Sequence, residues 1–154
     1  MSKVILISGE ICSGKDTTVQ RNYSSDQYKH IDLGSLVRKR FQTQQRIFDN
    51  NLEPYFIEQI SDAIKQDQGK STFVITGLRQ PTLCKKIAAL FDEVQYIYLV
   101  APRHILKQRF EDRKDVKDVS ITFEDAIAGD QSLGMKELQL YLLTEVQCDF
   151  IKTY

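Results

Sequence analysis

Short apolar runs alternate along the chain with longer segments in which apolar residues recur every three or four positions. Runs with the character of strands occupy residues 3–8, 28–31, 72–76, 94–100 and 149–153. Continuous apolar runs are typical of strands that are buried on both faces of a parallel sheet. The pattern therefore predicts an α/β fold in which helices cover both faces of a five-stranded parallel sheet.

Helical periodicity and boundary residues mark the segments between these runs. Helices are predicted over residues 15–22, 33–48, 120–134 and 135–146, and others are predicted to begin at Pro54, Pro81 and Pro102. Proline suits the first turn of a helix, where its missing N–H group is not needed. Within the 120–134 segment, Thr122 is expected to be the N-cap, with Asp125 in the position that completes a capping box.

The composition is that of an ordinary globular domain. The chain has 154 residues, of which 42% are hydrophobic and 27% are charged, so a single domain over residues 1–154 is expected. Basic and acidic residues number 21 each, and this zero net charge argues against a globally basic nucleic-acid-binding protein. No apolar run approaches ~20 residues, so no membrane span is expected, and the run at 4–7 is too short for a secretory signal.

The three cysteines, Cys12, Cys84 and Cys148, are far apart in the sequence and form no C-x-x-C pair. This spacing favours neither a zinc site nor a disulfide framework. A reduced, cytoplasmic protein is therefore expected.

The first predicted strand is followed directly by a segment with the pattern G-x-x-x-x-G-K. Ligands of open parallel sheets bind beyond the carboxyl ends of the strands, so a site is expected here. Glycines let backbone N–H groups point into the loop, and the N-terminus of the following helix adds partial positive charge, which suits phosphate. Lys15 supplies a full charge for the β- and γ-phosphates. The residues predicted to bind ATP are Gly9, Glu10, Ile11, Cys12, Ser13, Gly14, Lys15, Asp16, Thr17 and Thr18.

The hydroxyl residue that usually follows this lysine is shifted by one place. Asp16 comes first and Thr17 second, and both are expected near a magnesium ion. The pattern G-K-x-T resembles that of adenylate kinase and its nucleoside monophosphate kinase relatives, and G-K-D-T itself is similar to phage deoxynucleoside monophosphate kinases. The resemblance implies a three-layer P-loop NTPase fold with ATP and Mg²⁺ as cofactors.

The resemblance to these kinases extends to the ends of the second and third predicted strands. Gly34 and Arg38 match the family segment T-G-D-x-L-R, which implies that Arg38 binds an acceptor phosphate through its two-pronged guanidinium group. Gly77 matches the family segment D-G-x-P-R. The predicted acceptor-binding residues are Gly34, Arg38 and Gly77, which match the family segments, together with Asp32, which lies nearby, and Arg79, which the topology of the sheet directs toward the cleft.

The third strand end also departs from the family pattern. Arg79 precedes the proline instead of following it, and Thr76 replaces the acidic residue that helps to organise Mg²⁺ in the family. The run G-L-R-Q-P is similar to a segment of dephospho-CoA-kinase-like proteins. A carboxylate at the end of the second strand, Asp32, remains available nearby.

Arg109 and Arg113 are four residues apart, so they share one face of the helix that begins at Pro102. The resemblance implies that this pair opens a lid and contacts the nucleotide and the transferred phosphate. Lys15, Arg79, Arg109 and Arg113 are therefore the predicted catalytic residues. No arginine follows Arg113, which implies a short lid at about 114–134, and the acceptor-binding helices are expected at about 33–68.

The leading hypothesis is an ATP-dependent phosphotransferase whose acceptor is a nucleoside or deoxynucleoside monophosphate. The alternative is a P-loop kinase with a hydroxyl acceptor, either dephospho-CoA-like or a hydroxymethylated pyrimidine in DNA, for which Asp32 is the candidate base. DNA is a partner only in that alternative; otherwise the partners are small nucleotides, with no membrane. A third hypothesis is a slow nucleotide-hydrolysing switch.

Overall fold

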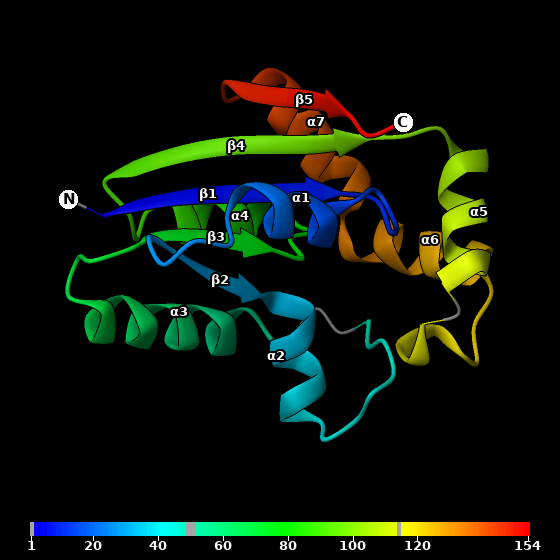
Figure 1. Cartoon of the computed structure of the whole chain (residues 1–154), viewed down its shortest axis with the longest axis horizontal. Helices are drawn as coiled ribbons and strands as arrows, with labels where there is room; N and C mark the ends of the chain where they lie inside the picture. The colour runs from blue at the N-terminus through cyan, green and yellow to red at the C-terminus, as the bar shows by residue number, and fades with distance from the viewer. Residues whose placement is uncertain (1, 49–51, 114) are drawn as a thin grey trace.

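The computed structural model describes residues 2–48, 52–113 and 115–154. Its strands are all parallel and form one five-stranded sheet with the order β2-β3-β1-β4-β5, which confirms the predicted α/β class (Figure 1). The strands are β1 (Lys3–Gly9), β2 (Tyr28–Asp32), β3 (Thr72–Thr76), β4 (Glu93–Val100) and β5 (Cys148–Lys152).

The central strand, β1, pairs with β3 on one side and with β4 on the other. Residues 4–8 are all nearly excluded from solvent, as the continuous apolar run predicts. The carboxyl end of β1 therefore lies in the middle of the sheet edge, flanked by the ends of its two neighbours.

Helices pack on both faces of the sheet and beyond its carboxyl edge. They are α1 (Lys15–Asn22), α2 (Leu33–Arg40), α3 (Glu53–Asp67), α4 (Pro81–Ala88), α5 (Arg103–Arg113), α6 (Phe123–Leu133) and α7 (Met135–Thr144), with a 3₁₀ turn, η1 (Val116–Asp118). The first helix lies on one face, α3, α4 and α7 pack on the other, and α5 and α6 stand beyond the strand arrowheads (Figure 1). In the described part of the chain, no helix is long and apolar enough to cross a membrane.

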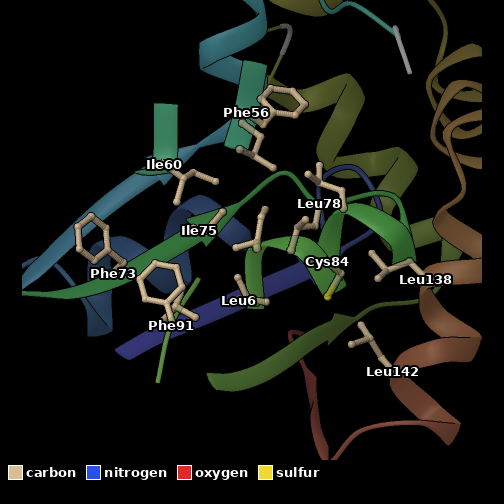
Figure 2. Close-up of a cluster of buried hydrophobic side chains, with 14 of the residues drawn as sticks. Leu6, Phe56, Ile60, Phe73, Ile75, Leu78, Cys84, Phe91, Leu138 and Leu142 are labelled. Carbon is tan, nitrogen blue, oxygen red and sulfur yellow. The ribbon is translucent and has the colours of Figure 1, made fainter. Parts of the chain in front are cut away.

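The larger core lies between the sheet and the helices α3, α4 and α7. Figure 2 shows Leu6 and Ile75 from the sheet facing Ile60 of α3 and Leu138 of α7, and all four side chains are almost completely buried. Burial of one such aliphatic side chain contributes roughly 1.5–3 kcal/mol, so this layer fixes the sheet against its helices. The rigid sheet in turn sets the positions of the loops at its carboxyl edge.

The helix predicted over residues 33–48 is wrong beyond Arg40. The chain leaves α2 through a Schellman motif, in which Thr43 N–H donates to Arg38 O (3.0 Å) and Gln42 N–H donates to Lys39 O (3.2 Å). Gln42 takes the left-handed conformation, with φ 52°, that glycine usually provides at this position. Because no glycine marks the end of the helix, the sequence pattern gave no sign of it.

Candidate functional site

The loop between β1 and α1 folds tightly back on itself. Cys12 (φ 63°) and Gly14 (φ 104°) are both left-handed, and Ser13 N–H donates to Glu10 O at 3.1 Å. A Cβ atom at Gly9 would overlap Ser13 Oγ, so only glycine permits this close return of the chain. Successive N–H groups in such a turn form an anion-binding concavity at the start of a helix.

Lys15 folds back over this loop. Its Nζ donates to Gly9 O (2.9 Å) and to Glu10 O (3.1 Å). Burial, and then the nearby Arg79, lower the pKa of Lys15 to about 8, although the Asp130 carboxylate acts in the opposite direction. The ammonium group is therefore charged at neutral pH and lies in a strongly cationic environment that an anion would relieve.

A cleft of about 860 Å³ extends from this loop along the carboxyl edge of the sheet. Arginine and lysine side chains from five separate segments line it, whereas the chain as a whole is electrically neutral. The predicted site residues that line the cleft are Ile11, Cys12, Gly14, Lys15, Asp16, Thr17, Thr18, Asp32, Gly34, Arg38, Gly77, Arg79, Arg109 and Arg113. The fold thus gathers at one place most of the residues that the motifs singled out along the sequence.

Asp32 lines the cleft at the end of β2. Its Oδ2 accepts hydrogen bonds from Ser35 N–H (3.3 Å) and Ser35 Oγ (2.7 Å), and Oδ1 accepts one from Thr76 Oγ1 (3.2 Å). Arg38 Nη2 lies 3.7 Å from Oδ2 and also donates to Ser35 Oγ. Burial alone would raise the pKa of Asp32, but the Ser35 hydrogen bond, the Arg38 charge and the Thr76 hydrogen bond hold it below its usual value. Asp32 is therefore ionised at neutral pH.

Asp32 lies beside the end of β3, where the family pattern has an acidic residue and this chain has Thr76. In the register of the two strands Asp32 lies opposite Thr76, the residue that replaces the family's acid. The hydrogen bond between them places a carboxylate from β2 beside the end of β3. The cleft thus has an ionised acid at this edge, although it comes from the neighbouring strand.

Magnesium ions prefer oxygen ligands and are commonly held by one or two protein groups together with substrate phosphates. Asp16 and Thr17, the predicted metal residues, both expose their side chains on the cleft wall next to Lys15. Asp32 provides a further ionised carboxylate. This donor set fits a magnesium ion that arrives with a nucleotide, and no group of three His, Cys, Asp or Glu residues able to hold a metal occurs among the described residues.

Arg79 is fixed by a residue that the sequence analysis missed. Its Nε donates to Asp130 Oδ1 (2.5 Å) and its Nη1 donates to Gly77 O (3.0 Å). Asp130 comes from α6 and is 1% exposed. Its position at the end of the apolar stripe of α6, where Phe123, Ala126 and Ile127 are buried, is a signal that could have revealed it.

Arg109 contacts the backbone of the phosphate loop. Its Nη1 donates to Cys12 O (3.1 Å) and to Thr153 Oγ1 (3.2 Å), and its Nη2 donates to Thr153 O. Thr153 Oγ1 in turn donates to Ser13 O at 2.7 Å. These contacts bind the segment after β5 to the phosphate loop. Arg113, one turn later, is exposed on the cleft wall and makes no ion pair with a described residue.

The loop after α2 meets the region predicted to be a lid. Arg46 forms a two-pronged buried ion pair with Asp118 (2.7 and 3.1 Å), and its N–H donates to Lys117 O (2.8 Å). The Phe48 ring packs so closely on Gly129 of α6 that a Cβ there would overlap it. We call these five residues the clasp. No sequence signal joins residues 72 positions apart, so the pairing could not be foreseen.

Comparisons with known proteins bear on the fold. No family model matches the chain, and no curated protein matches it. Among solved structures, an unliganded sugar kinase from Janibacter sp. HTCC2649 superposes with a TM-score of 0.68 at 14% identity, over 99% of this chain and 86% of that one. A gluconokinase from Sinorhizobium meliloti 1021 gives a TM-score of 0.65 at 12% identity, over 97% and 82%.

A chain of the Pnkp1/Rnl/Hen1 RNA repair complex is also similar, with a TM-score of 0.66 at 12% identity. The match covers 90% of this chain but 44% of that one, so this chain spans less than half the length of that relative. Together with the phosphate loop, these likenesses show that the chain has the three-layer fold of P-loop kinases. At such low identity they show the fold alone.

Proposed function

We propose that this protein is an ATP-dependent kinase that transfers the γ-phosphoryl group to a nucleoside or deoxynucleoside monophosphate. The observation that carries the proposal is the continuity of the cationic cleft. It runs from Lys15 in the phosphate loop to Arg38 and Arg79 at the ends of β2 and β3. A cleft of about 860 Å³ with cations at both ends suits two anionic ligands placed end to end.

The donor half follows from the loop and its helix. Gly9–Thr18 would hold the triphosphate, with Lys15 released from the loop carbonyls to pair with the β- and γ-phosphates. Arg113, which is exposed on the cleft wall, would neutralise charge that develops during transfer. Asp16 and Thr17 would hold a magnesium ion, which would offset the negative charge of the phosphates.

The acceptor half follows from the cations beyond β2 and β3. Arg38 and Arg79 line the cleft from separate strand ends and would orient an acceptor phosphate. A phosphate acceptor is already ionised, so it requires no strong general base. Positioning and charge neutralisation, which this cleft offers, account for most catalysis of phosphoryl transfer.

A hydroxyl acceptor is the second candidate, and a specific observation favours it. Asp32 is ionised, lies in the acceptor half, and partly neutralises Arg38 at 3.7 Å. A carboxylate in this position can accept the proton of a hydroxyl group as it attacks. Two of the structural neighbours are by name a sugar kinase and a gluconokinase, which supports the same chemistry.

The test is a labelling experiment with the purified protein and γ-labelled ATP. The acceptor panel contains each nucleoside and deoxynucleoside monophosphate, gluconate, dephospho-CoA, plain DNA and DNA with hydroxymethylated pyrimidines. Label on a monophosphate supports the leading proposal, and label on a hydroxyl acceptor supports the second. Release of inorganic phosphate with every acceptor unlabelled contradicts both.

Asp32→Asn separates the two candidates further. For a hydroxyl acceptor the loss of a general base lowers the rate by about 10²–10⁴-fold, whereas a monophosphate kinase should lose much less, because Asp32 would act there only through Arg38 and the metal. Asp26→Asn is the matched control, because Asp26 is an exposed aspartate before the other end of β2. A large loss in both variants would point to damage to β2 and not to a lost base.

A further inference from the structure

Asp130 is an unusual group to find in the apolar face of a helix. The residues one and two turns before it on that face, Phe123, Ala126 and Ile127, pack in a small core with Ile11 and other apolar residues. Asp130 is itself 1% exposed. A buried carboxylate is costly to desolvate, and the cost is offset only when both oxygens have good partners.

Both oxygens of Asp130 are used, and each holds a different part of the cleft. Oδ2 accepts a hydrogen bond from the Ile11 N–H group in the phosphate loop (3.2 Å). Oδ1 accepts one from Nε of Arg79 in the loop after β3 (2.5 Å). The carboxylate therefore joins the phosphate loop to an acceptor-side arginine that is 68 residues away in sequence.

These bonds leave Arg79 in a defined orientation. Nε is held by Asp130 and Nη1 by Gly77 O, so the direction of the guanidinium plane is set from two sides. In the described part of the chain, Nη2 has no protein partner, and Arg79 lines the cleft. A guanidinium group oriented before the ligand binds loses little entropy when it engages a phosphate oxygen.

We propose that Asp130 is a positioning residue that holds Arg79 and the Ile11 amide in one fixed arrangement, so that the phosphate loop and the acceptor arginine engage the transferred phosphoryl group together. This inference rests on the proposed kinase function. Asp130 itself touches no reacting atom; it acts through Arg79 and through the loop. Its replacement should therefore change rate and binding without removing any group that contacts the substrates.

The first experiment compares Asp130→Asn with Glu124→Gln, a change at an exposed residue of the same helix. Calorimetry gives ATP affinity, labelled ATP gives the rate, and ¹H–¹⁵N spectra report the Ile11 amide. Asp130→Asn loses a charge-assisted hydrogen bond, so its ATP affinity should fall by about 10-fold or more and its Ile11 amide signal should shift. Glu124→Gln should show neither change. Unchanged affinity with an unchanged Ile11 signal would overturn the proposal.

The second experiment is chemical rescue, which a merely structural role would not produce. In Arg79→Ala the buried carboxylate remains, so low-millimolar guanidinium chloride should bind beside it and restore part of the lost rate, whereas sodium chloride should not. In Arg79→Ala/Asp130→Asn the same addition should restore nothing. Equal rescue in both variants, or none in Arg79→Ala, would overturn the proposal.

A variant that avoids an unpaired buried charge covers the case in which Asp130→Asn does not fold. Arg79→Met/Asp130→Leu replaces the ion pair by apolar groups, which proteins often tolerate well. Compared with Arg79→Met, it should lose further ATP affinity because the Ile11 anchor is gone; equal affinity would overturn the proposal. If wild type binds ATP but labels no acceptor, the proposed function fails, while the binding arms still decide the role of Asp130.

Discussion

Lys15 combines two properties that make its protonation measurable. It lies over the loop that would hold phosphates, and burial together with Arg79 lowers its pKa to about 8. Bound phosphates favour the ammonium form and would raise this pKa again. Binding of an anion to the loop and proton uptake by Lys15 are therefore linked, so each should depend on pH in a direction that follows from the sign of the shift.

We predict that ATP binding without magnesium weakens as pH rises through about 8. Below that value Lys15 already carries its proton, so affinity is constant; above it a proton must be taken up, and affinity falls by at most about tenfold per pH unit. Calorimetry in two buffers of different ionisation enthalpy counts the protons. Lys15→Met should bind more weakly and lose this pH dependence, and equal proton uptake in both proteins would contradict the assignment.

The residues of the site were predictable to the extent that their chemistry is local. Lys15 and Gly14 lie in one continuous motif, and Arg38 lies four residues after Gly34, so spacing alone points to them. Asp130 acts through contacts with residues 51 and 119 positions away, which no local pattern encodes. Its placement on an apolar helix face was the accessible sign.

At the scale of elements, the clasp ties the loop after α2 to η1 and α6. Its buried ion pair joins Arg46 and Asp118, whose side chains are 8% and 4% exposed. The region predicted as a lid and the loop after α2 are therefore in contact beside the cleft. Two lids that move independently would not share such a contact. Disrupting the Arg46–Asp118 ion pair therefore tests how much this contact contributes to the fold around the cleft.

We predict that Asp118→Asn destabilises the fold by about 3–5 kcal/mol, because it leaves the Arg46 charge buried without its partner. Urea unfolding measures the change. Arg46→Met/Asp118→Leu should lose much less, since both charges are removed together. Glu124→Gln, which removes the exposed partner of Lys107, should leave the unfolding midpoint unchanged. A small effect of Asp118→Asn would show that the pair is open in solution.

A second prediction at this scale concerns Gly129 and Phe48. Alanine stabilises an exposed helix interior by about 1 kcal/mol relative to glycine. In this protein the new Cβ would overlap the Phe48 ring, so Gly129→Ala should destabilise the fold or displace the ring. In a Phe48→Ala background the same substitution should become stabilising. A double-mutant cycle in urea measures this change of sign, and additive effects would exclude the contact.

The elements themselves were largely predictable, and their ends were less so. The capping box at Thr122 and Asp125 forms as expected, and the prolines open α3 and α4. The end of α2 was missed because Gln42 provides the left-handed turn without a glycine. The end of a helix depends on the conformation of one residue, whereas the interior of a helix depends on a repeated pattern. The interior is therefore easier to predict from the sequence.

The whole molecule combines zero net charge with a cationic cleft at one edge of the sheet. The alternation of strands and helices predicted the parallel sheet, and that topology predicted where the site lies. Residues of the phosphate loop and α1, of α2 and the loop after it, of the ends of β2 and β3, of α5, and of the segment after β5 all line the cleft. A ligand bound there would meet residues from segments between Ile11 and Tyr154, so binding and global stability should be strongly coupled.

We predict that ATP raises the midpoint of thermal unfolding of the entire chain in one transition. A ligand at 100 times its Kd adds about 2.7 kcal/mol to the free energy of unfolding when it binds only the folded state. Because the attraction comes from partly exposed cations, the shift should shrink as salt is raised toward about 1 M, where the Debye length falls to about 3 Å.

Lys15→Met should unfold at an unchanged or higher temperature without ligand, since a buried charge is removed, yet show little shift with ATP. An ATP shift in Lys15→Met equal to that of wild type would mean that the nucleotide binds elsewhere than at the phosphate loop.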